Sequence, residues 1–315
     1  MGRLIAIANQ KGGVGKTTTA INLAIALASP TQRILLVDLD PQGNASSGIM
    51  PSSELFKVKQ SHLTIYEALM TFVPIAKVLR EAREQVFVAP SGPDLVGAEI
   101  ELATMAGRER RLGEILKPVR DDYAFILIDT PPSLGLLTLN ALVAADSVLV
   151  PMQCEYYALE GLSALLGTIA RVRKELNPRL KIEGVVLTMF DTRNRLSAEI
   201  AREVEKHLPT EIFQAVIPRN VRISESPSHG LAVMEYDAKS AGAEAYRGLA
   251  EELIARVGTA DRGDGATARA IDSSDQRDHG ARMAESTEKG GAADRKTWSL
   301  RALFARGEER GRRGT

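Results

Sequence analysis

The sequence predicts an α/β fold with a mostly parallel sheet, helices on both of its faces and a disordered C-terminal tail. Three observations lead to this prediction. Short, almost continuously apolar runs recur along the chain, as expected of strands that are buried on both faces. Helix-forming segments separate most of these runs, which is typical of a parallel sheet with crossover helices. After residue 257 large apolar side chains become rare, so that part of the chain cannot bury enough surface to order itself.

Seven apolar runs are predicted to be strands. They cover residues 4–8, 34–37, 86–89, 125–128, 147–150, 182–187 and 213–217. The helices predicted beside and between them cover residues 20–28, 65–70, 95–105, 112–116, 136–144, 159–176, 198–208 and 241–257. Residues 1–257 are long enough to form one large domain with a sizeable core.

The chain beyond residue 257 divides into two parts by composition. Residues 258–294 carry five basic and eight acidic residues and are predicted to form a flexible linker. Residues 295–315 carry seven basic and two acidic residues. The large apolar residues there are Trp298, Leu300, Leu303 and Phe304. They are compatible with a short amphipathic helix that docks on DNA or anionic lipid, and a solvated tail without a role is the alternative interpretation.

Composition restricts the function classes only loosely. The formal net charge is zero at pH 7, so any contact with DNA must come from a local basic patch. The single cysteine, Cys154, excludes an intrachain disulfide and fits a reducing cytosol. The first predicted strand leaves no room for a signal peptide, and no apolar run is long enough to span a bilayer. These features favour a cytoplasmic protein, and contact with a membrane is not expected.

A glycine-rich loop joins the first predicted strand to the first predicted helix. Residues 9–19 read Asn-Gln-Lys-Gly-Gly-Val-Gly-Lys-Thr-Thr-Thr. Glycines let the backbone approach phosphate oxygens closely, and the N-terminus of the helix adds a favourable dipole. Lys16 is expected to reach the β- and γ-phosphates of a nucleotide, and the Thr17 hydroxyl to bind Mg²⁺. The nucleotide-binding residues predicted here are Gly12, Gly13, Val14, Gly15, Lys16, Thr17 and Thr18.

Two other predicted strands end in aspartates that would face the same crevice. Asp40 is placed to hold or polarise an attacking water near the γ-phosphate. Asp38 is the second candidate, and a simple turn opener at residues 40–41 is the structural alternative. Asp129 has the form of an acid that holds Mg²⁺ directly or through water. The loop at residues 131–135 is expected to change with nucleotide state. The four histidines lack metal-ligand spacing, so no further metal is expected.

The loop departs from the strict Walker pattern, because Gln10 stands where that pattern has glycine and Lys11 opens the motif. This variant resembles the deviant Walker group of P-loop ATPases, which includes the ParA/Soj and MinD proteins, the nitrogenase iron protein and arsenite pump ATPases. Over residues 2–257 the chain most closely resembles the ParA/Soj chromosome-partitioning ATPases. Residues 95–102 and 151–161, which P-loop chemistry does not need, carry that distinction. The nitrogenase iron protein needs two cluster cysteines, which one cysteine excludes.

The resemblance implies a P-loop NTPase-like fold and an ATPase that needs Mg²⁺ and is slow without a partner. It implies that Lys11 crosses to the nucleotide of a second subunit, so that ATP closes a homodimer. Lys11, Lys16 and Asp40 would be catalytic, and Pro218 and Asn220 would lie beside the adenine. The dimer would bind DNA of any sequence on the nucleoid. A ParB/Spo0J-type partner would stimulate hydrolysis and so release the DNA.

The same resemblance places a DNA-binding face after the last two predicted strands. Its candidate residues are Arg193, Arg195, Arg219 and Arg222. Arginines that gather in strand-end loops with few nearby acids favour contact with phosphates. For each arginine alone, a solvated surface charge is the alternative. The family often has lysine where this chain has Leu231, so one expected cation is missing.

Two other functions are compatible with parts of the sequence. One is a MinD-like, membrane-associated positioning ATPase, whose mark would be an amphipathic C-terminal helix such as residues 295–306 could form. The other is a scaffold with an inactive nucleotide site. The intact Lys16, Thr17, Asp40 and Asp129 argue against a scaffold, and the motifs of residues 2–257 favour the partitioning ATPase.

Overall fold

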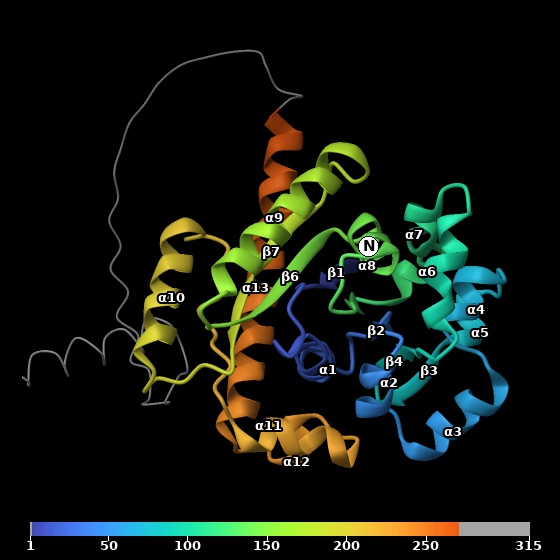
Figure 1. Cartoon of the computed structure of the whole chain (residues 1–315), viewed down its shortest axis with the longest axis horizontal. Helices are drawn as coiled ribbons and strands as arrows, with labels where there is room; N and C mark the ends of the chain where they lie inside the picture. The colour runs from blue at the N-terminus through green and yellow to red at the C-terminus, as the bar shows by residue number, and fades with distance from the viewer. Residues whose placement is uncertain (1, 271–315) are drawn as a thin grey trace, which may run out of the picture.

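The computed structural model describes residues 2–270, which are built around a seven-stranded sheet (Figure 1). The strands are β1 (Arg3–Ile7), β2 (Ile34–Asp38), β3 (Arg80–Arg83), β4 (Val86–Ala89), β5 (Phe125–Asp129), β6 (Ser147–Gln153) and β7 (Lys181–Thr188). Their order across the sheet is β3-β4-β2-β5-β1-β6-β7. All neighbouring strands are parallel except β3 and β4 at one edge. The predicted α/β fold with a mostly parallel sheet is confirmed.

The helices of residues 2–270 alternate with the strands, as the sequence predicts. They are α1 (Lys16–Leu27), α2 (Asn44–Ile49), α3 (Ser52–Ser61), α4 (Ile65–Met70), α5 (Ile75–Val78), α6 (Leu95–Ala103), α7 (Arg111–Leu116), α8 (Leu136–Ala144), α9 (Ala158–Glu175), α10 (Arg195–His207), α11 (Val221–Glu225), α12 (Val233–Tyr236) and α13 (Ala241–Ala270). In this part of the chain no helix combines the length and the apolar character that crossing a membrane requires.

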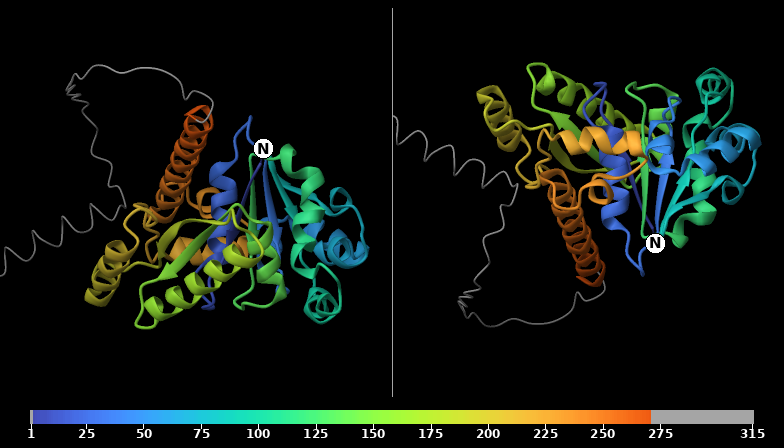
Figure 2. Two further views of the ribbon diagram at one scale, coloured as in Figure 1. Left: turned by 90° about the horizontal axis from the view of Figure 1, so that it is seen from above. Right: turned by 90° about the horizontal axis from the view of Figure 1, so that it is seen from below.

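Helices cover both faces of the sheet (Figure 2). In β1, Leu4 and Ala6 pack on one face, and Ile5 and Ile7 pack on the other, because successive strand residues point in opposite directions. The first face carries α4 and α6 to α10, and the second carries α1, α2 and α13. Both β2 and β5 are buried along their whole length, including the aspartates that end them. The fold therefore places two buried carboxylates at one edge of the sheet.

The last predicted strand, residues 213–217, does not form a regular strand. Its backbone meets β7 only through the N–H groups of Phe213 and Ile217. Between them, the N–H groups of Gln214 and Ala215 donate to the Glu252 carboxylate of α13. That carboxylate replaces the ladder of hydrogen bonds that a strand would need. The seventh strand of the sheet is β3 instead, whose sequence Arg-Glu-Ala-Arg contains no apolar run and so gives no strand signal.

Helix α13 passes the predicted domain boundary at residue 257 and continues to Ala270. The first part of the predicted linker is thus helical, because extending an existing helix avoids the unfavourable nucleation step. The rest of that linker and the predicted basic tail at residues 295–315 lie outside the described residues. The division of the chain at residues 257 and 294 therefore stays a prediction.

Candidate functional site

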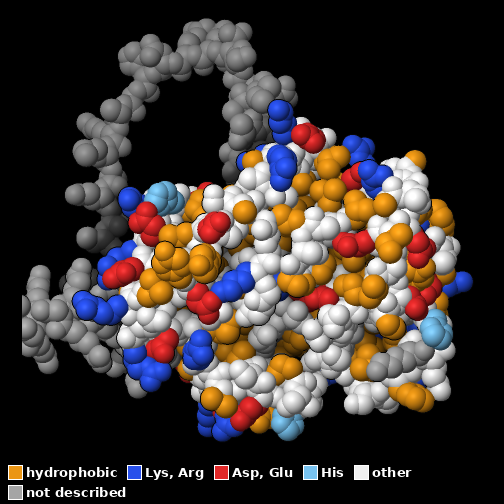
Figure 3. Space-filling view, viewed as in Figure 1, with side chains coloured by type: hydrophobic (Ala, Val, Ile, Leu, Met, Phe, Trp, Pro, Cys, Tyr) orange, Lys and Arg blue, Asp and Glu red, His pale blue; other side chains and the backbone are white. Residues whose placement is uncertain are grey.

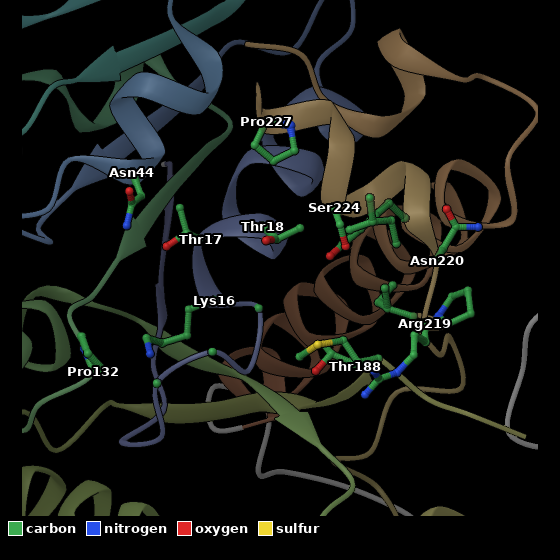
Figure 4. A pocket seen from close by; sticks show the side chains of 18 of the residues that line it. Lys16, Thr17, Thr18, Asn44, Pro132, Thr188, Arg219, Asn220, Ser224 and Pro227 are labelled. Atoms are coloured by element: carbon green, nitrogen blue, oxygen red, sulfur yellow. The ribbon is translucent and has the colours of Figure 1, made fainter. Parts of the chain in front are cut away.

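A cavity of about 530 Å³ opens at the carboxyl ends of the parallel strands (Figure 4). Ligands of doubly wound sheets bind at this edge, and the volume suits a nucleotide. Figure 4 shows Lys16, Thr17 and Pro132 on one side of the cavity and Arg219, Asn220 and Ser224 on the other. The predicted nucleotide-binding residues that line it are Gly12, Gly13, Gly15, Lys16, Thr17, Thr18, Pro218 and Asn220. Val14 does not line it and is buried beneath the loop.

The backbone of the glycine-rich loop has the shape that phosphate binding requires. Gly13 and Gly15 have φ of 74° and 84°, a left-handed conformation that favours glycine. Helix α1 begins at Lys16 directly after this turn, so the free N–H groups of its first turn lie at the cavity. The loop therefore offers backbone donors and a positive helix end to the same anion.

Two side chains that are not among the predicted nucleotide-binding residues hold this loop in place. Asn9 Nδ2 donates to the Pro151 carbonyl at 2.7 Å, and Asn9 Oδ1 accepts from the Lys11 N–H at 3.0 Å. Thr188, the last residue of β7, donates its hydroxyl to the Val14 carbonyl at 2.8 Å. The sequence analysis did not identify Asn9 or Thr188. Both are polar residues at the end of an apolar strand, which is the signal that identified the aspartates.

Lys16 is the cation of the cavity. Its side chain is largely buried, with 7% of the residue exposed, and its ammonium donates to the Lys11 carbonyl at 3.2 Å. Burial lowers the pKa of Lys16, while the carboxylates of Asp129 and Asp40 act in the opposite direction. The Lys16 ammonium therefore remains positively charged and attracts phosphates. A nucleotide that carries Mg²⁺ brings its own cation to balance the two nearby carboxylates.

The predicted magnesium residues, Thr17 and Asp129, fit a cation. Asp129 is fully buried, and among the described residues neither of its oxygens has a hydrogen-bond partner. Burial raises the pKa of Asp129 well above its usual value, and the nearby Asp38 carboxylate adds to this. The Thr17 hydroxyl, which is close to the carboxylate but outside hydrogen-bonding geometry, and the Lys16 ammonium offset part of the effect. A buried carboxylate without partners is unfavourable, and a divalent cation with its water shell would satisfy it.

The two aspartates after β2 have different surroundings. Asp38 is fully buried and accepts hydrogen bonds from the Ser46 N–H at 2.8 Å and the Ser46 hydroxyl at 2.7 Å. Burial raises the pKa of Asp38 to about 6 against the effect of these bonds. Asp40 lines the cavity, and its Oδ1 accepts from the Gln42 N–H at 3.0 Å. Asp38 therefore organises the loop after β2, and Asp40 is the carboxylate that a ligand meets.

Lys11 takes a different position from Lys16. It does not line the cavity, and its ammonium makes an ion pair with Glu155, just before α9. Two exposed aromatic side chains, Tyr156 and Tyr157, follow Glu155 and pack edge to face with their ring centroids 5.0 Å apart. The signature lysine of the motif is thus held at the surface of the molecule.

The far end of the cavity is formed by the segment after residue 216. Pro218 and Asn220 line it, as expected of neighbours of the base. Asn220 also caps α11, because its side-chain oxygen accepts from the Arg222 N–H at 2.9 Å. Arg219, which the sequence analysis assigns to DNA, lines the cavity between them. The remaining residues of this wall were not identified from the sequence: Met189, Ile217, Ile223, Ser224, Pro227 and Tyr246.

The other predicted DNA-binding arginines are exposed, but acids lie closer to them than the sequence suggests. Both ends of the Arg193 guanidinium pair with Asp191, and Arg222 pairs with Glu225 at 2.9 Å. Arg195 begins α10 and is exposed. Basic and acidic side chains stand next to each other over α10 and α11 (Figure 3). The expectation of few nearby acids is wrong, because Asp191 and Glu225 lie two and three residues along the chain from Arg193 and Arg222 and pair with them.

Comparisons with known proteins agree with this site. A profile of the AAA domain matches residues 2–182. The chain is 53% identical over 259 residues to chromosome partitioning protein ParA of Myxococcus xanthus, covering 81% of this chain and 89% of that protein. It is 51% identical over 256 residues to sporulation initiation inhibitor protein Soj of Bacillus subtilis, covering 81% and 99%. It also resembles the structure of cobyrinic acid a,c-diamide synthase from Mycobacterium smegmatis with bound ATP analogue and magnesium, with a TM-score of 0.69, 37% identity and coverage of 81% and 95%.

Proposed function

This chain belongs to the ParA/Soj family of chromosome-partitioning ATPases, and we propose that ATP switches it between a DNA-bound homodimer and a free monomer. It binds ATP with Mg²⁺ and hydrolyses ATP to ADP and phosphate. The dimer binds DNA without sequence preference, which holds the protein on the nucleoid within the cytoplasm. A ParB/Spo0J-type partner accelerates an otherwise slow hydrolysis, and the resulting monomers leave the DNA.

The lining of the cavity supports a role for each reacting group. Lys16 and the N–H groups of the loop bind the β- and γ-phosphates. Thr17 and, through water, Asp129 would hold Mg²⁺, which would neutralise part of the phosphate charge. Asp40 orients the attacking water or accepts its proton. Pro218 and Asn220, at the far end of the cavity, contact the base.

The position of Lys11 is the observation that carries the dimer proposal. Lys11 is paired with Glu155, and the side chains of the two residues are 39% and 47% exposed. An ion pair this exposed contributes about 0–1 kcal/mol. A hydrogen bond to a charged group such as a phosphate is worth about 1.5–3 kcal/mol. The nucleotide of a second subunit can therefore draw Lys11 away from Glu155, and ATP then holds the two subunits together.

Lys11→Ala is expected to retain ATP binding and to lose the ATP-dependent dimer. The cavity keeps Lys16 and the whole glycine-rich loop, so affinity for ATP in the monomer should change less than about threefold. The cross-subunit contact to phosphate is removed. Size-exclusion chromatography with light scattering, with and without ATP and Mg²⁺, measures the outcome.

Glu155→Gln is the matched control for this experiment. It breaks the same ion pair but keeps the lysine, so it should still form the dimer with ATP. If Lys11→Ala and the wild type dimerise equally with ATP, the cross-subunit role of Lys11 is wrong. If both variants fail to dimerise, the ion pair rather than the lysine is what the interface needs.

Arg222→Glu is expected to weaken DNA binding in the presence of ATP by about tenfold without changing dimerisation. The arginine would contact phosphates, so the loss should be the same for unrelated DNA sequences. Each phosphate contact adds roughly 0.9 to the slope of log affinity against log salt, and the variant should lower that slope by about one. Arg193→Glu should act in the same direction and less strongly. Fluorescence anisotropy with two unrelated duplexes at several salt concentrations measures this.

Two further variants make the DNA experiment specific. Arg222→Ala removes the charge without adding a carboxylate beside Glu225 and Asp237, so it tests DNA contact with less effect on α11. Arg171→Glu makes the same charge change at an exposed position of α9, a helix on the opposite face of the sheet from α11, and should leave affinity unchanged. A loss that depends on DNA sequence would contradict contact with phosphates alone.

A further inference from the structure

We propose that Glu99 of α6 is a positioning residue for ATP hydrolysis, because its carboxylate holds the loop that follows Asp129 against the nucleotide cavity. The inference rests on the proposed roles of Asp129 and of that loop. It gives a function to residues 95–102, a segment that P-loop chemistry does not require and that the reaction described above does not use.

The Glu99 carboxylate caps the first turn of α8. Helix α8 has no side-chain cap of its own, since its N-cap residue is Gly135. The Leu137 N–H donates to Glu99 Oε1 over 3.4 Å. A Cβ atom built on Gly135 would lie 2.0 Å from Glu99 Oε1 and 2.8 Å from its Cδ. The carboxylate therefore occupies the space that a side chain at residue 135 would need, at the positive end of the helix.

Residues 130–135 run from Asp129, at the end of β5, to the capped first turn of α8. After Asp129, the Thr130 hydroxyl donates to the Ile7 carbonyl of β1 at 2.9 Å. At the other end of the loop, the Thr138 hydroxyl of α8 donates to the Ser133 carbonyl at 2.6 Å. Between these two anchors, Pro132 lines the cavity. A Cβ atom built on Gly12 would lie 3.9 Å from the Pro132 Cβ, so this loop lies beside the phosphate loop. A shift of the first turn of α8 would move Pro132.

The remainder of α6 is held independently of this contact. Leu95, Ala98 and Leu102 are fully buried in the core and fix the helix on the sheet. Glu99 follows Ala98 and is half-buried, whereas Val96 and Ile100 are 63% and 75% exposed. The core contacts of α6 do not need the carboxylate. Its contact is directed to the N-terminus of α8, where backbone N–H groups would otherwise lack a partner.

Glu99→Ala is expected to lower kcat for ATP about tenfold while KM for ATP changes less than twofold. The phosphate-binding loop is intact, so binding persists, but the loop beside the reacting phosphate loses its anchor. Small misplacements of groups around a reaction centre reduce rates strongly. The measurement is steady-state ATPase activity of the full chain with Mg²⁺, over a range of ATP concentrations.

Gly135→Ala is the second variant, and it leaves Glu99 in the sequence. Gly135 has φ of −75°, which alanine adopts without strain, and the three atoms nearest to the new Cβ would all belong to the Glu99 carboxylate. It should lower kcat to the same extent. Both changes remove the same contact, between the Glu99 carboxylate and the first turn of α8. The double variant should therefore be no slower than either single variant. Glu99→Gln keeps an acceptor oxygen and should restore most of the rate.

Glu101→Ala is the matched control, because Glu101 lies on the same helix and accepts a hydrogen bond from Tyr66 on the surface. It should keep the wild-type kcat. If Gly135→Ala hydrolyses ATP at the wild-type rate, or if the two single effects multiply, the positioning role is wrong. If Glu99→Ala were slow only because it folds poorly, its Tm would be lower than that of the wild type. The rate would then not be restored in Glu99→Gln. If Asp129→Ala keeps Mg²⁺-dependent hydrolysis, the proposed site itself fails, independently of Glu99.

Discussion

Lys16→Ala is expected to abolish ATP binding. Lys16 is the one lysine that lines the cavity in the described residues, and although burial lowers its pKa, the carboxylates of Asp129 and Asp40 are close enough to act in the opposite direction. Truncating one member of a buried charge pair costs about 2–5 kcal/mol, which corresponds to a loss of affinity of roughly 30- to 4,000-fold. The effect should lie at the upper end here, because the carboxylates would then face the phosphates with Mg²⁺ as the remaining counter-charge.

Thermal unfolding with and without ATP and Mg²⁺ measures this loss directly. A ligand at 100 times its Kd stabilises the folded protein by about 2.7 kcal/mol, so the Tm of the wild type should rise with ATP. The Tm of Lys16→Ala should not change on adding ATP. Lys11→Ala serves as the control, since it removes the other lysine of the motif and should keep the rise. An equal rise for Lys16→Ala would place the phosphates elsewhere.

The parts of the fold that the sequence predicts are those whose apolar residues are consecutive. β1, β2, β4 and β5 are short apolar runs, and their burial on both faces follows from that pattern. The edge strand β3 has a polar sequence and depends on β4 as its partner, so no local signal marks it. Residues 213–217 are apolar enough for a strand, but Glu252, far along the chain, takes their backbone donors.

The candidate site divides in the same way. The residues around the phosphates are consecutive, so one motif identifies Gly12 to Thr18, and strand ends identify Asp40 and Asp129. The wall of the base end combines Met189 and Tyr246, which lie far apart in the sequence and meet only through the fold. The ion pair of Lys11 with Glu155 joins residues 144 positions apart. Arg219 was predicted to bind DNA because its neighbours in sequence are basic, but it lines the cavity.

Asp40→Ala is expected to have the opposite effect to Lys16→Ala: ATP binding and the dimer persist, and hydrolysis is lost. A residue that orients water or accepts its proton contributes a factor of about 100 to 10,000. The backbone at residue 40 would stay in place, because its carbonyl accepts from the Ser91 hydroxyl at 2.7 Å. The variant should therefore accumulate as an ATP-bound dimer that stays on DNA. Phosphate release and the rate of dissociation from DNA measure the two halves of this prediction.

Two isosteric variants separate the proposed role of Asp40 from that of Asp38. Asp40→Asn keeps an oxygen for the Gln42 N–H but cannot accept a proton, so it should lose hydrolysis as fully as Asp40→Ala where Asp40 accepts the proton, and only in part where it orients the water. Asp38→Asn weakens the buried bonds to Ser46, so it should lower the Tm before it lowers the rate per folded molecule. Wild-type hydrolysis by Asp40→Ala would remove Asp40 from the reaction. Loss of hydrolysis by a fully folded Asp38→Asn, with Asp40→Asn active, would transfer the role to Asp38.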